Sequence, residues 1–473
     1  MRMRRLLVMA LAGGLVAAGT GLFWLQAQGV APRALAPYLA KRSSGHNPLI
    51  EGSGGVVART LLVLDRGEGI AAAPRLALGA REQPVANTGT ATRMVDVSDV
   101  DDLRRAMAQA EAGDVITLLP GAYRVRGSSL RAARPGQPGL PVTLRAAVPG
   151  SVLLELQTTV GFKVSAPHWR FENLALRGVC ASDSSCEHAF QVVGAATHFV
   201  AINNIVTDVN AAFKINSEGG RFPDHGLIES NTIENSRPRK TANPVTPVDL
   251  VGASGWIVRA NLVSDFVKAG GDRISYGAFA KGAGSGNVFE RNVFWCERTL
   301  RGQPGQRVGL SLGGGGTMKE ACRDSRCLVE QQGGILRDNL IVGCSDAGIY
   351  LNSAAASTVD RNTLLDTAGI QVRYPTSSAT LRGNLLDGAI VSRDGAVVRD
   401  QDNVTAPLAY SYLGYHPVRA LFRDLESFDL GWRDGAVPQR VRQDDETSGP
   451  DLCGGPPHTG YGAFADFSAC LAP

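Results

Sequence analysis

A short motif built around asparagine recurs along the middle of this 473-residue chain and constrains its fold more than any other feature. In each copy the asparagine precedes two mostly apolar or small residues, as in VFERNVF and TVDRNTLL. The copies contain Asn173, Asn204, Asn231, Asn261, Asn292, Asn339, Asn362 and Asn384. Most lie 22 to 31 residues apart, a period typical of a solenoid whose coils stack on one another.

The residues between the asparagines indicate strands. Apolar runs of about four to six residues alternate with turn residues, which is typical of short strands. The leucine-rich consensus is absent, and no 3.6-residue period supports helical repeats. We therefore expect an all-β solenoid of about ten to twelve coils, in which the asparagines form an internal ladder at one turn and satisfy backbone groups from coil to coil.

The flanking segments predict the domain organisation. DVDDLRRAMAQAEAGD, residues 99–114, is expected to form a helix that caps the solenoid, because Leu103, Met107 and Ala110 fall on one helical face. We expect the solenoid over residues 93–400 and a C-terminal cap over its open end at 401–473. Residues 30–92 are interpreted as an irregular linker with one short strand at 56–64.

The N-terminus and the cysteines indicate an extracytoplasmic body. Residues 1–29 predict a signal peptide or a membrane anchor, since MRMRR precedes an uncharged stretch from Leu6 to Leu25. Eight cysteines without a CxxC pair argue against a zinc site and for disulfides. Two pairs bracket short segments and are predicted to be bonded, Cys180 with Cys186 and Cys453 with Cys470. Pairing among Cys296, Cys322, Cys327 and Cys344 is left open.

One strand of each coil places polar residues at alternate positions. If its apolar residues face the core, the outward set is Gln191, Lys214, Asn216, Asp249, Lys281, Arg307, Tyr350, Asn352, Gln371 and Arg373. This predicts a polar and basic stripe, whereas the whole chain carries a net charge of only +4, which argues against a general nucleic-acid binder. The stripe suits an acidic linear polysaccharide. The alternative is an ordinary solvated sheet face.

β-Elimination on a uronate requires a base for the C5 proton, a cation for the carboxylate and a proton donor for the leaving oxygen. Lys281 is the candidate base, because neighbouring cations and partial burial lower a lysine pKa and the following GAGSG leaves room for a polymer. Arg307, on the next coil, is the candidate carboxylate clamp or acid. The other residues of the stripe are candidate substrate-binding residues. His168, His188, His198 and His225 are interpreted as structural.

The order of these motifs resembles a known family. A helix ending in GD, a strand into LLPGAYRV, then PVTLRA and the asparagine coils resemble the right-handed parallel β-helix of the pectate-lyase type over residues 95–400. The resemblance is strongest to the chondroitinase B and alginate lyase group. That group places a base lysine on one coil and an arginine on the next, matched by Lys281 in FAKGAGSG and Arg307 in GQRVGLSL.

The resemblance also implies a cofactor and an activity. The family binds calcium through acidic residues shortly before the lysine, but residues 274–280 contain none, and Asp249 and Asp272 match poorly. No metal ligand is therefore assigned, and calcium stays an open alternative. The implied activity is a polysaccharide lyase, acting as a monomer that is secreted, periplasmic or attached to the inner membrane. A uronate epimerase and a non-catalytic acidic-glycan binding or assembly protein are the alternatives.

Overall fold

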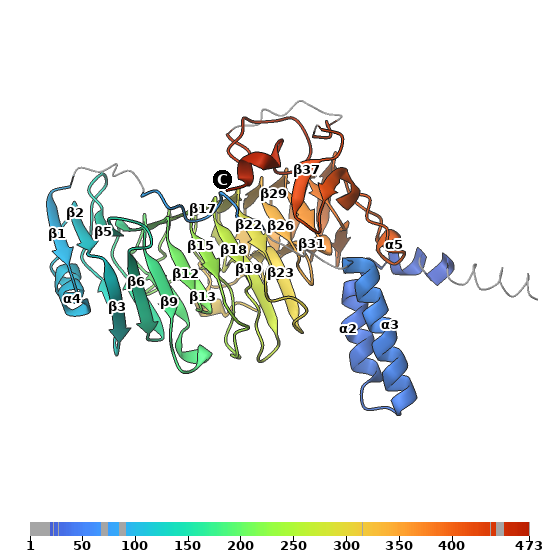
Figure 1. Ribbon diagram of the computed structural model, residues 1–473, viewed down its shortest axis with the longest axis horizontal. Coiled ribbons are helices and arrows are strands. Elements are labelled where there is room, and N and C mark those ends of the chain that lie inside the picture. Colours follow the sequence, from blue (N-terminus) through green and yellow to red (C-terminus); the bar gives the residue numbers. More distant parts are fainter. Residues whose placement is uncertain are drawn as a thin grey trace, which may run out of the picture.

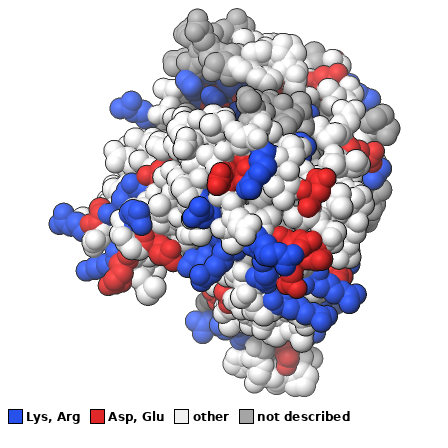
Figure 2. All heavy atoms as spheres, turned by 90° about the vertical axis from the view of Figure 1, so that its left-hand side faces the viewer, with Lys and Arg blue, Asp and Glu red and all other residues white. Residues whose placement is uncertain are grey.

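The computed structural model describes residues 19–21, 23–26, 28–67, 74–84, 91–314, 316–435, 437–440 and 449–472. Three long parallel sheets run along one solenoid (Figure 1). They confirm the right-handed parallel β-helix to which the sequence motifs point. Positive and negative side chains are interspersed on the face that includes the β1 end (Figure 2), as the near-balanced net charge of +4 leads one to expect.

The strands of the three sheets follow one another in each coil. Sheet I contains β1 (Arg93–Val97), β2 (Asp114–Leu118), β5 (Val142–Ala146), β8 (Trp169–Glu172), β11 (Val200–Ile202), β14 (Leu227–Glu229), β17 (Ile257–Arg259), β21 (Val288–Glu290), β25 (Ile335–Arg337), β29 (Ser357–Asp360), β32 (Ser378–Arg382) and β35 (Val397–Gln401). Sheet II contains β3 (Gly121–Arg126), β6 (Val152–Gln157), β9 (Ala175–Gly178), β12 (Ile205–Thr207), β15 (Thr232–Glu234), β18 (Leu262–Ser264), β22 (Val293–Trp295), β26 (Leu340–Val342), β30 (Thr363–Leu365) and β33 (Leu385–Leu386). Sheet III contains β4 (Leu130–Ala132), β7 (Val160–Val164), β10 (His188–Val193), β13 (Ala211–Asn216), β16 (Val248–Val251), β19 (Ile274–Lys281), β23 (Gln306–Gly313), β27 (Ile349–Asn352), β31 (Gly369–Arg373) and β34 (Ala389–Arg393).

Parallel pairing in register brings like residues together inside the solenoid. Phe162, Phe190 and Phe213 occupy neighbouring register positions, and successive ring centroids are 5.2 Å apart. These rings belong to one continuous apolar core that reaches from Val97 on β1 to Leu386 on β33. Burial of such apolar stacks is the main force that stabilises a solenoid, because a single coil cannot bury its own apolar side.

The predicted asparagine ladder runs between sheets I and II. Each ladder amide oxygen accepts from the backbone N–H of the preceding asparagine, as Asn292 Oδ1 does from Asn261 N at 3.0 Å. Asn261 Nδ2 donates to the backbone oxygen of Ile228 and to Asn292 Oδ1. The ladder extends through Asn403, beyond the last predicted member. The ladder therefore joins the buried turns of successive coils by direct hydrogen bonds.

Asn173 is the exception to the predicted ladder. The register pairs Glu172 with Ile202, so Asn173 lies opposite Asn203 and accepts from its amide. The ladder position of that coil is Leu174, whose N–H donates to Asn204 Oδ1 at 3.0 Å. The expectation for Asn173 was wrong by one residue because sequence spacing alone does not fix the strand register.

The ends of the solenoid differ in how well the sequence predicts them. Helix α4 (Val100–Ala108) is confirmed, with Asp99 accepting from Asp102 N as its N-cap and Leu103 and Met107 buried. The C-terminal segment was expected over the open end. Its aromatic residues instead pack on the outward side of sheet II, where Phe428 stacks on Trp295. β36 (Phe422–Asp424) and β37 (Asp429–Trp432) form its hairpin.

The segment interpreted as an irregular linker contains two helices, α2 (Pro32–Ser43) and α3 (Pro48–Arg66). The strand expected at 56–64 was wrong. Asn47 caps α3 by accepting from Ile50 N, and Pro48 occupies the first turn, so the β-branched run continues as helix against α2. No described helix is long and apolar enough to span a bilayer. The predicted signal or anchor at 1–29 lies mostly outside the described residues.

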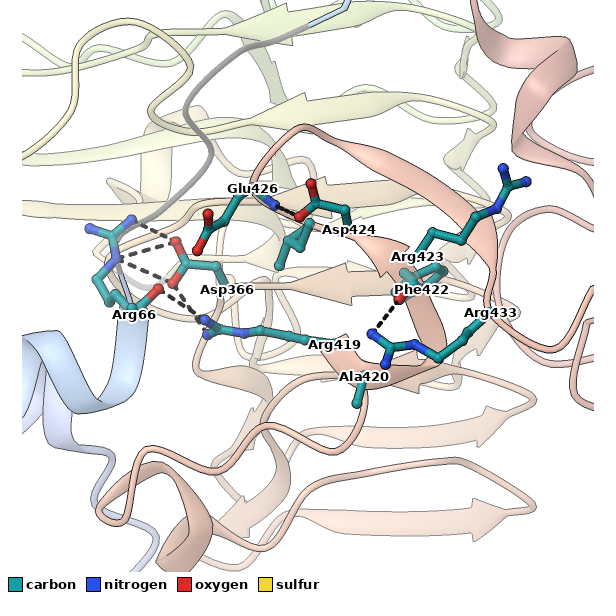
Figure 3. Close-up of a pocket in the computed structure, with 11 residues that line it drawn as sticks. Arg66, Asp366, Arg419, Ala420, Phe422, Arg423, Asp424, Glu426 and Arg433 are labelled. Atoms are coloured by element: carbon teal, nitrogen blue, oxygen red, sulfur yellow. Dashed lines mark hydrogen bonds and ion pairs between the residues drawn. The ribbon is translucent and has the colours of Figure 1, made fainter.

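Buried ion pairs fasten this helical hairpin to the solenoid. Arg33 pairs with Asp65 at 2.7 Å and with Asp366 at 3.1 Å, and all three side chains are largely buried. Figure 3 shows Arg66 and Arg419 converging on Asp366 from the hairpin and from the C-terminal segment. The base of the hairpin is therefore fixed to the body, whereas its far end projects away from it (Figure 1).

The ladder gives the first prediction. Asn261→Leu should lower the free energy of unfolding by about 3 kcal/mol, because it leaves buried backbone groups on neighbouring coils without partners. Urea denaturation followed by circular dichroism measures this loss. Asn403→Leu is the matched control at the half-exposed end of the ladder, where water can replace the amide, and should cost about 1 kcal/mol. Equal losses in both variants would contradict the ladder's role.

Candidate functional site

The outward residues of sheet III form two register rows. The first row contains Arg131, Lys163, Gln191, Lys214, Asp249, Phe279, Ser311, Tyr350, Gln371 and Val391. The second row lies two residues further along each strand and contains Asn216, Lys281, Asn352, Arg373 and Arg393. The predicted outward set therefore lies on one face, with one exception.

A corner in sheet III explains the exception. The strands carry a register row of small residues, Gly161, Ala189, Ala212, Pro247, Gly277, Gly309 and Gly348. A Cβ on Gly277 would lie 2.7 Å from Phe294, and one on Gly309 would lie 2.4 Å from Ile341, both in the core. The next residue along each strand also faces the core, so strict alternation ends here. Residues before the corner therefore point to the opposite face from the one that a period of two predicts.

Arg307 lies before this corner and is buried. The register places it opposite Ser275, whereas Lys281 is six residues further along its own strand. A rise of about 3.3 Å per residue puts these positions about 20 Å apart. Arg307 Nε contacts Glu297 Oε1 at 2.5 Å, and its side chain is 2% exposed. The expectation that Arg307 points to solvent beside Lys281 was wrong, because the 297–305 loop supplies a buried partner.

Lys281 ends β19 on the outward face and is half-buried. Its Nζ lies 4.6 Å from the centroid of the Phe279 ring, and no hydrogen bond or ion pair engages this ammonium among the described residues. Burial lowers the pKa of Lys281, Asp249 and Glu330 oppose this shift, and Lys214 adds to it. Glu330 accepts from Gly282 N at 3.0 Å and so holds the turn that follows the lysine. A partly desolvated, unpaired amine is the arrangement that a general base requires.

Two strands away, Lys214 Nζ contacts Asp249 Oδ2 at 2.7 Å. The other oxygen, Asp249 Oδ1, is buried and has no hydrogen-bond partner in the part of the chain that the structure describes. His188 borders this pair, since the charges of Lys214 and Asp249 both act on its pKa. Burial, reinforced by Lys214, lowers the pKa of His188 to about 4, and no described residue forms a hydrogen bond with its Nδ1. Among the described residues, the site therefore contains two buried polar atoms without a hydrogen-bond partner.

Two tyrosines extend the site toward the C-terminal coils. The Tyr276 and Phe279 rings meet edge to face at 5.6 Å, so Phe279 separates Lys281 from Tyr276. Burial, with contributions from Tyr350 and Asp346, raises the pKa of Tyr276 to about 12, so its hydroxyl keeps its proton at neutral pH. Asn352 Nδ2 donates to Tyr350 Oη at 3.1 Å. These contacts place a protonated donor and a half-buried base on either side of the Phe279 ring.

Sequence reasoning missed His188, Tyr276 and Phe279. His188 and Tyr276 lie just before the corner, where a period of two assigns them to the core. The row of Gly, Ala and Pro at equivalent positions could have revealed the corner, had the coils been aligned on it.

The remaining predicted residues lie on the same face. Gln371 accepts from Arg393 Nη2 at 3.1 Å, Arg373 pairs with Asp394, and Asn216 donates to the backbone oxygen of Ser217.

The two carboxylates considered as calcium ligands, Asp249 and Asp272, do not fit a calcium site. Asp249 is paired with Lys214, and Asp272 Oδ1 accepts from Lys268 Nζ at 2.7 Å. Calcium requires six to eight oxygen ligands, and an ammonium at contact distance from each carboxylate opposes the cation. The one compact group of ligand types among the described residues contains Cys322 and Cys327, which are bonded to each other. We therefore derive no catalytic step through a metal.

The cysteines form four disulfides among the described residues. Both predicted pairs are confirmed, Cys180 with Cys186 and Cys453 with Cys470. The pairs left open are Cys296 with Cys344 and Cys322 with Cys327. This complete pairing fits an oxidising compartment.

Comparisons with protein-family models and with curated proteins find no match. Solved structures give matches at low identity. An alginate lyase from Paenibacillus sp. is 16% identical, with a TM-score of 0.38, covering 67% of this chain and 96% of that one. A pectate lyase is 15% identical, with a TM-score of 0.44, covering 80% and 98%. The A-module of a mannuronan C-5 epimerase from Azotobacter vinelandii is 14% identical, with a TM-score of 0.39, covering 70% and 94%.

Arg307 gives the second prediction. Arg307→Ala should lower the free energy of unfolding by about 3 kcal/mol, because it removes one partner of a buried ion pair. Arg301→Ala, an exposed position in the adjacent loop, is the control and should change stability by less than about 0.5 kcal/mol. Thermal and denaturant unfolding compare the two. Unchanged stability in Arg307→Ala would contradict a structural role.

His188 gives the third prediction. Its pKa lies near 4 in the folded protein and near 6.5 in the unfolded chain. Above pH 6.5 the histidine is neutral in both states and adds no pH dependence. As the pH falls from 6.5 to 4 the unfolded chain binds the proton first, so stability decreases. Between pH 6.5 and 4 the free energy of unfolding, measured by denaturation, should fall more for the wild type than for His188→Gln. Equal losses of free energy in the two proteins would contradict the lowered pKa of His188.

Proposed function

We propose that this protein is an extracytoplasmic polysaccharide lyase that cleaves a uronate-containing acidic glycan by β-elimination. The observation that carries the proposal is Lys281, a half-buried lysine with a lowered pKa and no ionic partner among the described residues, on a face rich in cations and amides. More broadly, the fold and this face support a carbohydrate-active protein with an acidic polysaccharide as its partner.

In the proposed reaction the neutral amine of Lys281 removes the C5 proton of the uronate. The electron pair forms the C4–C5 double bond, and the C4–oxygen bond breaks. Tyr276, whose hydroxyl keeps its proton at neutral pH, protonates the leaving oxygen. This assignment replaces Arg307, whose guanidinium is bound to Glu297. The reaction balances, since one proton is taken from carbon and one is given to oxygen.

Cations on both sides of Lys281 would hold the acidic chain. Lys214 lies two strands away in one direction, and Arg373 lies three strands away in the other. Strands of one sheet are about 4.8 Å apart, so the cations span roughly 25 Å of the sheet face. Asn216, Asn352, Gln371 and Tyr350 supply hydrogen-bonding groups between them. A polymer lying across the strands would contact each in turn.

A uronate epimerase would use the same base, since proton removal from C5 is common to both reactions. A non-catalytic glycan-binding protein would use the cations alone. Both reactions also require a proton donor, for the leaving oxygen in a lyase and for C5 in an epimerase, so Tyr276 suits either.

The fourth prediction tests this function. Incubation with alginate, glycosaminoglycans and pectic polymers should generate the ultraviolet absorbance of a 4,5-unsaturated uronate. Lys281→Met should reduce the rate by about a thousandfold or more, because it removes the base. Lys163→Met, on the same face but four strands away, is the matched control and should keep most of the activity. Thermal unfolding checks that both variants fold.

Other outcomes would sort the alternatives. Solvent deuterium entering C5 without new absorbance would identify an epimerase. Binding without either signal across the panel would overturn the enzymatic proposal.

A further inference from the structure

The helical hairpin α2–α3 exposes an unusual amount of apolar surface. Of the described large apolar residues that are exposed, nine lie within residues 23–63: Phe23, Trp24, Tyr38, Leu49, Ile50, Val56, Val57, Leu62 and Val63. The described part of the solenoid, several times longer, also contributes nine, so their density is several times higher in the 23–63 segment. Single exposed apolar residues are ordinary, but a concentration of this kind marks a surface that is covered by something else.

Most of these side chains form one stripe along α3. Leu49, Val56 and Val63 are seven residues apart, and Ile50 and Val57 lie beside them, so helical geometry puts all five on one side. Leu49 is 84% exposed and Val63 62%. We call these five residues the α3 stripe. Over 19 residues α3 is about 28 Å long, so the stripe runs along most of the helix.

The polar residues within the stripe bond to the helix itself. Ser53 Oγ donates to the backbone oxygen of Leu49 at 2.6 Å, and Thr60 Oγ1 donates to that of Val56 at 3.0 Å. Hydroxyls satisfied in this way can enter an apolar medium without losing a hydrogen bond. The stripe is therefore compatible with lipid along its whole length.

The opposite side of α3 already has partners. Ala58 and Asp65 are buried, and Leu62 faces a cavity of about 740 Å³ between the hairpin and the solenoid. The stripe is thus the side of the hairpin that the described residues leave uncovered.

Charges on the hairpin favour an anionic membrane surface. The exposed cations are Lys41, Arg42 and Arg59, and Glu51 is the exposed acid. Just before the hairpin, Phe23 and Trp24 are 76% and 60% exposed, at the end of the uncharged stretch that follows MRMRR. Aromatic residues at the end of an apolar segment, with lysine and arginine nearby, are typical of the interface between lipid tails and headgroups.

We propose that the α3 stripe lies in the surface of an anionic lipid bilayer and that the hairpin thereby orients the solenoid on the membrane. The ion pairs of Arg33 with Asp65 and Asp366 hold the hairpin rigidly to the body, so docking of α3 also sets the direction of sheet III. The proposal is independent of the lyase activity.

The fifth prediction uses the full chain and a fluorescent label. All cysteines of the described residues are in disulfides, so a single introduced cysteine can be labelled selectively. Val56→Cys lies on the stripe, and Val148→Cys, of similar exposure on the solenoid, is the matched control. On vesicles of phosphatidylcholine and phosphatidylglycerol, aqueous iodide should quench the label at 56 about fivefold less than the label at 148, and lipid-borne nitroxide should quench it more.

A second variant separates the stripe from the N-terminal segment. In the double variant Ile50→Asp with Val63→Asp, aqueous iodide should again quench the label at 56. Thermal unfolding should stay unchanged because both positions are exposed. Equal iodide access at 56 and 148 on vesicles would overturn the proposal, as would a failure of the chain to associate with them. Protection at 56 that needs no vesicles and rises with protein concentration would identify a second copy as the occupant instead.

Discussion

The bonding of each coil to the next by buried asparagine side chains is the constraint on which the rest of this structure depends. Every ladder amide bonds its own coil to the backbone of the preceding one, as Asn261 does by accepting from Asn231 N and donating to the backbone oxygen of Ile228. A coil displaced by one residue would lose these bonds and turn its apolar residues outward. The ladder therefore fixes the register, and the register fixes which side chains become neighbours in sheet III.

The candidate site follows from this register and from one interruption of it. Parallel strands bring Lys214 and Asp249 into direct contact although 35 residues separate them. The small residues at the corner let two successive positions face the core. The side chains of His188 and Tyr276, just before the corner, therefore lie on the same face as the site. Lys281, beyond the corner, keeps an ammonium without an ionic partner among the described residues, in contrast to Arg307, whose charge is compensated by Glu297 inside the protein.

Ion pairs, more than repeated strand pairing, attach the flanking segments to the solenoid. The Asp366 carboxylate forms ion pairs with Arg33, Arg66 and Arg419, which belong to α2, α3 and the C-terminal segment. Surrounding arginines lower the pKa of this carboxyl against the effect of burial, so it stays charged. One acidic residue of the solenoid thus joins three elements distant in sequence, and it leaves the far end of the hairpin free to meet another surface.

The sequence by itself determined the solenoid, its asparagine ladder, the capping helix and the outward position of Lys281, because these depend on local periodicity that repeats many times. Tertiary structure decided what has no repeat. Arg307 became buried because an irregular loop brought Glu297 to it, and Asp366 became the attachment point of the hairpin because Arg33 and Arg66 reach it from a segment distant in sequence. Each of these outcomes depends on a contact between residues with no common period, and no local pattern records such a contact.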